Sequence, residues 1–96
     1  MQNTKKEKNN FEYTSLENSK EYFQTQDLGL SSSLVSRGFE LVALDKQDQR
    51  KVLFIFKREV GIEQDIDDHW NGRLEIKSLV YFDALRMLKN RIHSSE

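Results

Sequence analysis

The spacing of apolar residues changes several times after residue 20, and each change predicts a different element. Between Thr25 and Phe39 the apolar positions fall mainly on one face of a helix. These positions are Leu28, Leu30, Leu34 and Val35. Thr25 or Asp27 can cap the start of this helix, and Gly38 stands where a left-handed residue commonly ends one. The pattern therefore predicts a first helix.

Two strongly apolar runs follow and predict an antiparallel hairpin. The runs "FELVALD" and "KVLFIF" are rich in β-branched, aromatic and aliphatic residues, and the polar "KQDQR" between them has the length of a hairpin connection. In the second run Val52, Phe54 and Phe56 point to one side of the strand. Leu53 and Ile55 point to the other side, so both faces are apolar. We expect helices to cover one face, and a docked N-terminal segment or a second subunit to cover the other.

The C-terminal segment predicts a long helix. Its apolar residues follow an i, i+4, i+7, i+11 spacing, and Phe82 widens their stripe. These residues are Tyr81, Leu85, Leu88 and Ile92. Ser78 can cap the start of the helix. The preceding "RLEIK" is expected to be a loop or a short edge strand.

The run "EQDIDDHWNG", from Glu63 to Gly72, concentrates carboxylates, a histidine and the only tryptophan of the chain. On a helical wheel Ile62, Ile66 and Trp70 form an i, i+4, i+8 stripe. This spacing predicts a short helix that turns these three side chains inward and ends at the "NG".

The polar residues of this run diverge around the predicted helix. Glu63 and Asp67 flank one side of the apolar stripe. Asp65 and His69 flank the other side, one turn apart, where they can form an ion pair. A metal site needs three or four ligands that converge on one point, and no position on the wheel brings more than two of these together. The spacing predicts no metal site and no acid–base catalysis, and an acidic surface facing a basic partner stays open as the functional alternative.

Composition divides the chain into a polar tail and one domain. The opening "MQNTKKEKNN" has no apolar residue after its methionine, so burial cannot offset the entropy of ordering it. We expect residues 1–19 to form a disordered tail, although a few apolar residues near its end leave docking on the domain open. A chain of 96 residues has room for one hydrophobic core, which we assign to residues 20–96.

The near-neutral charge and the absence of cysteine exclude several classes of protein. The formal net charge of −1 gives no basic or acidic footprint over the whole chain. Without cysteine the chain has no disulfide, thiolate metal site or cysteine nucleophile. No glycine belongs to a phosphate-binding loop, so we expect no cofactor, no small-molecule substrate and no enzymatic activity. No apolar run approaches the roughly 20 residues of a membrane helix, and we expect a cytoplasmic protein without membrane contact.

A local set of basic residues provides a case for nucleic-acid binding. Cations bracket the second strand of the hairpin, and others form an i, i+3, i+7 stripe on the last helix with His93. The candidate contact residues are Arg50, Lys51, Lys57, Arg58, Arg86 and Lys89. They form a basic patch if the hairpin and the helix share a face. A solvated face, with cations complementing the dipole at the helix end, is the competing interpretation.

The order of these motifs resembles a small uncharacterised domain family of bacteria and their phages, known only as a domain of unknown function. The family pattern is F-x-T-x-D-L-x-L, then G-F, F-x-F, an aromatic residue before a small polar turn, and L-R-x-L-K. The matching residues are Phe23, Thr25, Asp27, Leu28, Leu30, Gly38, Phe39, Phe54, Phe56, Trp70, Leu85, Arg86, Leu88 and Lys89. The resemblance spans Tyr22 to Ile92, and it departs from the family at Ser31, Ser32 and Ser33, where relatives often carry alanine. It implies the order of elements and transfers no activity, while the occurrence in phages slightly favours a role near nucleic acid.

These patterns together predict a single small α+β domain. Its expected order is helix, antiparallel hairpin, short helix and long C-terminal helix, with a third short edge strand as an option. The predicted function is a non-catalytic protein-interaction or structural module that self-associates, as a homodimer, through the two-faced hairpin. The alternative is a nucleic-acid-binding accessory protein of a bacterium or phage that uses the basic residues of the hairpin and the last helix.

Overall fold

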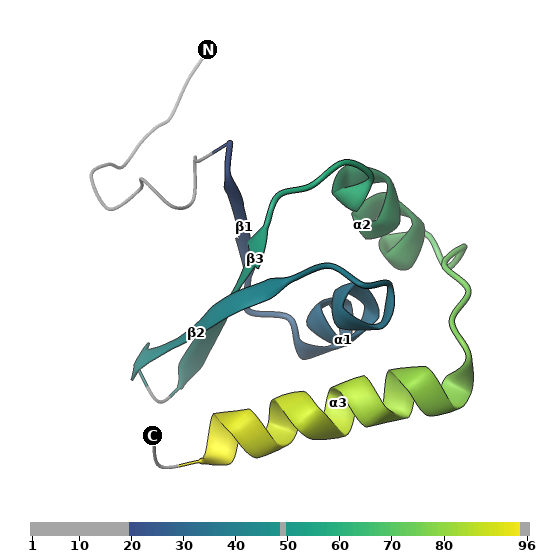
Figure 1. Cartoon of the computed structure of the whole chain (residues 1–96). Helices are drawn as coiled ribbons and strands as arrows, with labels where there is room; N and C mark the ends of the chain where they lie inside the picture. Colours follow the sequence, from purple (N-terminus) through teal and green to yellow (C-terminus); the bar gives the residue numbers. More distant parts are fainter. Residues whose placement is uncertain (1–19, 49, 95–96) are drawn as a thin grey trace.

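A three-stranded antiparallel sheet and three helices make up the described part of the computed structural model, residues 20–48 and 50–94 (Figure 1). In chain order the elements are β1 (Tyr22–Thr25), α1 (Leu28–Ser36), β2 (Leu41–Asp48), β3 (Lys51–Lys57), α2 (Ile62–Trp70) and α3 (Ser78–His93). The α+β class and the predicted order of helix, hairpin, short helix and long C-terminal helix are confirmed. The predicted tail lies outside the described residues.

The central strand of the sheet is β3, because β1 and β2 pair on either side of it. Both pairings are antiparallel, with Phe56 opposite Phe23 of β1 and opposite Leu41 of β2. The third strand is therefore β1, and residues 73–77, the "RLEIK" segment, form no strand. A strand of four residues carries too few positions to show an alternation, so its pairing with the apolar β3 decides its conformation.

Local signals define both ends of α1. The carboxylate of Asp27 accepts a hydrogen bond from the backbone N–H of Leu30 at 2.7 Å, as expected of a residue that caps a helix. Beyond the helix, Gly38 has a φ of 96°, in the left-handed region that side chains rarely adopt. The predicted first helix is confirmed at both ends.

The three serines of α1 pack in the interior. Ser31, Ser32 and Ser33 are each at most 3 % exposed. The hydroxyls of Ser31 and Ser32 donate to the carbonyls of Asp27 and Leu28 at 2.8 and 2.9 Å, so their polar groups are satisfied within the helix. The small side chains allow α1 to pack closely against α2 and α3.

The hydrophobic core lies between one face of the sheet and the three helices. Its members are Leu30, Leu34, Phe54, Phe56, Ile62 and Leu88, each at most 2 % exposed. Because α1, α2 and α3 all contribute side chains, all three helices cover the same face of β3 (Figure 1). Phe54 and Phe56 share one face of β3, as the alternation predicts, and this is the face that the helices cover.

The opposite face of β3 is also apolar, as its alternation predicts. Ile55 is 8 % exposed and lies between Gln24 of β1 and Ala43 of β2. No helix within the described residues covers this face. Cover by the N-terminal segment would involve residues outside the described part, and cover by a second subunit stays a prediction.

The inward stripe of α3 is largely the predicted one. Leu88 is fully buried, and Tyr81, Leu85 and Ile92 are half-buried. Ala84, which was not assigned to the stripe, is also buried at 6 % exposed. Phe82, however, is 52 % exposed, so the prediction that it widens this stripe is wrong. The helix begins at Ser78, so the prediction that Ser78 caps it is wrong; the N-cap residue is Lys77, which makes no side-chain capping bond.

A lysine of the hairpin holds the C-terminal end of α3. The Nζ of Lys46 donates to the carbonyls of Arg91 and Ser94 at 3.0 and 3.1 Å. Carbonyls at the C-terminal end of a helix carry a partial negative charge, so the lysine both donates hydrogen bonds there and complements the helix dipole. Within the described residues no helix combines the length and apolar character needed to cross a membrane.

Candidate functional site

The acidic run folds as the predicted short helix, α2, but turns a different side inward. Ile62 is fully buried and Ile66 is half-buried, whereas Trp70 is 59 % exposed. Asp65 is only 8 % exposed. At ~100° per residue, the inward side is centred near Ile62 and His69, a rotation of roughly 50° from the predicted stripe. The prediction that Trp70 points inward is therefore wrong.

The rotation places two polar side chains of α2 against α1. The Nε of Arg37 donates to Oδ2 of Asp65 at 2.9 Å, and the Oγ of Ser33 lies 2.9 Å from Nδ1 of His69 in a second hydrogen bond. Ser33 and Arg37 are four positions apart, and so are Asp65 and His69, so the two contacts lie one helical turn from each other. The hydrogen bond with Asp65 and its negative charge raise the pKa of Arg37 above the ordinary arginine value. We name these four residues the α1–α2 polar contact, which takes the place of the predicted ion pair between Asp65 and His69.

The remaining carboxylates of α2 pair with different cations. Glu63 pairs with Arg58. Asp67 and Asp68 pair with Arg73 at 2.8 and 3.2 Å. Among residues 20–48 and 50–94 no three histidine, aspartate or glutamate side chains are grouped so that they could hold a metal ion. The acidic run is therefore a series of separate ion pairs around one helix.

The predicted nucleic-acid contact residues of the hairpin lie at opposite ends of β3. Arg50 and Lys51 lie at the hairpin turn, whereas Lys57 ends the strand, about 20 Å away at ~3.3 Å per residue. Lys51 and Lys57 alternate with Phe54 and therefore lie on the face away from the helices.

The other three predicted contacts lie apart from these. Arg58 pairs with Glu63, and its guanidinium lies over the ring of Phe23 at 5.7 Å. Arg86 and Lys89 lie on the side of α3 that faces away from Leu88 and the core. The six residues thus occupy several sides of the molecule, and nucleic-acid contact by them stays a prediction.

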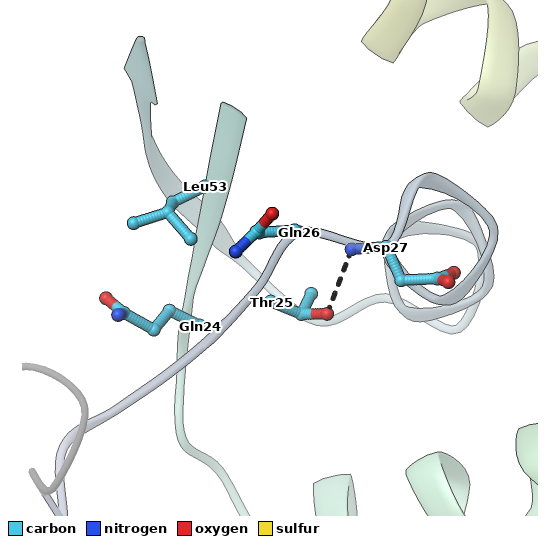
Figure 2. Close-up of a pocket in the computed structure, with 5 residues that line it drawn as sticks. All are labelled: Gln24, Thr25, Gln26, Asp27 and Leu53. Atoms are coloured by element: carbon cyan, nitrogen blue, oxygen red, sulfur yellow. Dashed lines mark hydrogen bonds between the residues drawn. The ribbon is translucent and has the colours of Figure 1, made fainter. Parts of the chain in front are cut away.

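A surface hollow of about 440 Å³ lies between β1, β3 and the start of α1 (Figure 2). Its lining residues are Gln24, Thr25, Gln26, Asp27 and Leu53. The Oγ1 of Thr25 accepts a hydrogen bond from the backbone N–H of Asp27 at 3.1 Å, and the carboxylate of Asp27 points away from Gln24 and Leu53 (Figure 2). That carboxylate caps α1. The hollow therefore presents amides and a leucine, and its only ionisable side chain is engaged in holding the helix.

The outward side of α3 carries a second stripe, which the sequence analysis did not recognise. Its members repeat at alternating steps of three and four residues, the spacing by which helices pack on each other in coiled coils. They are Leu79, Phe82, Arg86, Lys89 and His93, which we name the α3 outer stripe. All five are exposed, with Leu79 at 69 % and Phe82 at 52 %. The alternating spacing was visible in the sequence, but the inward stripe accounted for Phe82 first.

The α3 outer stripe has an apolar half and a basic half. Leu79 and Phe82 form the apolar half, near the start of the helix. The guanidinium of Arg86 lies over the ring of Phe82 at 5.2 Å and also pairs with Asp83 at 3.3 Å. Arg86 therefore contacts the aromatic ring of the apolar half while its charge belongs to the basic half.

One family model matches this chain. It is described as "Domain of unknown function (DUF5659)" and covers residues 20–94. No curated protein and no solved structure matches the chain. The match begins two residues before β1 and ends one residue after α3, so it covers every element of the fold.

Proposed function

The chain belongs to this family of domains of unknown function, and from the α3 outer stripe we propose that it is a non-catalytic protein-interaction module. The observation that carries the proposal is the exposure of Leu79 and Phe82 side by side on one helix. Exposed apolar side chains arranged at helical spacing are characteristic of surfaces that receive another helix.

The chemistry of the α3 outer stripe defines the partner that it fits. An amphipathic helix can pack apolar side chains against Leu79 and Phe82, which removes their apolar surface from water. Carboxylates further along that helix would face Arg86, Lys89 and His93 and give the contact its orientation. The preferred partner is therefore an acidic amphipathic helix.

Nucleic acid fits this surface less well. Phosphates would contact only the basic half of the stripe and would leave Leu79 and Phe82 exposed. Further cations that could extend the contact, such as Lys51 and Lys57, lie on the far face of the sheet. A protein partner uses the whole stripe, which is why we favour it.

A labelled synthetic helix tests the proposal. The probe has about 14 residues, with two leucines one turn apart on one face and three glutamates further along the same face. We expect saturable binding by fluorescence anisotropy, at least about tenfold weaker for Phe82→Ala and for a control peptide with lysines in place of the glutamates. Val60→Ala is the matched protein control, because Val60 is fully exposed outside the stripe.

Two results would contradict the proposal. Equal binding of the peptide to wild type and to Phe82→Ala would remove α3 as the docking surface. Saturable binding of a 20-base-pair duplex, about tenfold weaker in Arg86→Glu/Lys89→Glu and unchanged in Phe82→Ala, would assign the surface to nucleic acid instead.

A further inference from the structure

The exposed side of α2 carries a stripe of opposite charge to the α3 outer stripe. Its members are Glu63, Asp67 and Trp70, which we name the α2 outer stripe. The side chains of Glu63 and Asp67 are 69 % and 61 % exposed, and Trp70 is 59 % exposed. These residues fall within about 60° of one another on the helix, at ~100° per residue. One face of α2 therefore carries two carboxylates and then, nearer the C-terminal end of the helix, an apolar ring.

The two outer stripes match in length and order. On α2 the distance from Trp70 back to Glu63 is about 10.5 Å, at ~1.5 Å per residue. On α3 the distance from Phe82 to Lys89 is also about 10.5 Å by the same rise. In an antiparallel arrangement of the helices, the tryptophan and the phenylalanine meet at one end and the glutamate and the lysine at the other.

The middle of the two stripes is complementary as well. With Trp70 opposite Phe82, Asp67 lies opposite Arg86 to within one residue. This register joins an aromatic pair to two pairs of opposite charge, the combination that sets both contact and orientation between helices.

We propose that the α3 outer stripe binds the α2 outer stripe of a second copy of this chain, with the two helices antiparallel. The inference rests on the proposed function and identifies the acidic amphipathic partner as α2. A contact of α3 with another α3 along the whole stripe is less favourable: in the parallel arrangement Arg86 and Lys89 face a second set of cations, and in the antiparallel arrangement the basic half faces the apolar half.

Existing ion pairs of the two stripes do not prevent this contact. Glu63 pairs with Arg58, Asp67 pairs with Arg73, and Arg86 pairs with Asp83. In the pairs of Asp67 and Arg86 both side chains are more than half exposed, and Glu63 is 69 % exposed although Arg58 is only 27 % exposed. Exposed ion pairs contribute little to stability, so these carboxylates and Arg86 can accept a second partner.

Charge reversal in both stripes tests the inference. Glu63→Lys/Asp67→Lys makes the α2 outer stripe basic, and Arg86→Glu/Lys89→Glu makes the α3 outer stripe acidic. By sedimentation velocity from about 1 μM to 1 mM, we expect wild type to associate and each double variant alone to associate at least about tenfold more weakly. An equimolar mixture of the two variants should recover the association of wild type, because the α2 outer stripe of each variant is then opposite in charge to the α3 outer stripe of the other variant.

Trp70 reports on the same contact by fluorescence. As the only tryptophan of the chain, and 59 % exposed, it should shift its emission to shorter wavelength as the wild-type concentration rises. The matched control for Glu63→Lys/Asp67→Lys is Glu40→Lys/Glu75→Lys, which raises the net charge by the same amount at exposed positions outside both stripes. This variant should associate as wild type does.

Three outcomes would overturn the inference: a monomer at every concentration, association unaffected by either double variant, or a mixture that fails to recover. The acidic peptide separates these from failure of the proposed function, because Glu63→Lys/Asp67→Lys keeps the α3 outer stripe intact. Peptide binding by this variant without self-association would refute the second copy as partner and leave the interaction module standing. Loss of binding to the peptide in wild type would count against the module itself.

Discussion

The α1–α2 polar contact and the α3 outer stripe both depart from the rule that apolar side chains point inward, in opposite directions. In the first, Asp65 is nearly buried while Trp70 of the same helix is 59 % exposed. In the second, Leu79 and Phe82 are exposed although the opposite side of α3 packs on the core through Ala84 and Leu88. The difference lies in the neighbours: α2 finds polar partners on α1, whereas the outward side of α3 finds no partner within the described residues. The buried polar residue belongs to a contact made inside the chain, whereas the exposed apolar stripe is the surface for which we propose a contact with another molecule.

The largest loss of stability should come from a substitution on the inward side of α3, and the same kind of substitution on its outward side should cost little. Leu88→Ala should lower the free energy of unfolding by about 2 to 5 kcal/mol, because Leu88 is fully buried in the core. Leu79→Ala, on the outward side, should change it by no more than about 0.5 kcal/mol. Urea denaturation followed by circular dichroism measures both values. Equal losses would mean that the outward side of α3 is part of the folded core.

Removal of the ion pair in the α1–α2 polar contact should have the second largest effect. Asp65→Ala should cost about 1 to 2 kcal/mol, less than a fully buried pair, because the side chain of Arg37 is 45 % exposed. Asp67→Ala, a surface carboxylate on the same helix, should cost at most about 1 kcal/mol. Thermal unfolding of both variants gives the comparison. If Asp67→Ala were the more destabilising, the inward side of α2 would have been assigned wrongly.

The pKa of Arg37 determines the pH above which the arginine loses its charge and the ion pair with Asp65 is lost. Because Asp65 raises that pKa, Arg37 stays charged at neutral pH, and its stabilising contribution is lost on the alkaline side only as pH rises through the raised pKa, above the ordinary arginine value. Stability curves measured between pH 6 and about 9 should therefore show no step that disappears in Arg37→Gln. Such a step would contradict the assigned direction.

Ser33→Ala should have a smaller effect, because it removes one hydrogen bond and no ion pair. The expected loss is about 0.5 to 1.5 kcal/mol, from the contact of the Ser33 hydroxyl with Nδ1 of His69. Ser36→Ala is the control, since that hydroxyl bonds only within α1, to the carbonyl of Ser32. Chemical denaturation of the two variants should show the larger loss for Ser33→Ala.

Phe82→Ala should have the smallest effect on stability and a clear effect on association. Loss of the ring removes the contact with Arg86 but no buried surface of the core, so the free energy of unfolding should change by about 0.5 kcal/mol. Self-association measured by sedimentation should weaken at least about tenfold. If Phe82→Ala unfolded more easily but associated normally, Phe82 would belong to the packed core and not to an interaction surface.

Most elements of the fold were predictable because their signals are local. The capping by Asp27, the left-handed Gly38 and the alternation around Phe54 each depend on residues a few positions apart. Strand β1 was not predictable in this way, since its four residues become a strand only by pairing with β3.

The candidate interaction surface was predictable only in part. Arg86, Lys89 and His93 were recognised as a basic stripe from their spacing. Phe82 was assigned to the core, because a helical wheel shows which residues share a face and not which face another element covers. The six cations proposed for nucleic acid illustrate the same limit, as their division between two ends of β3 and the outward side of α3 depends on how the elements pack.

Local chemistry alone was enough to determine the class of fold, the order of its helices and hairpin, and the ends of α1. Tertiary packing decided which side of each helix is buried. In α2 the stripes that contain Trp70 and Asp65 both include Ile62, so the periodicity permits either rotation. Ser33 of α1 and Arg37 at its C-cap form hydrogen bonds with His69 and Asp65, and those bonds allow the polar side to be buried while the indole stays exposed.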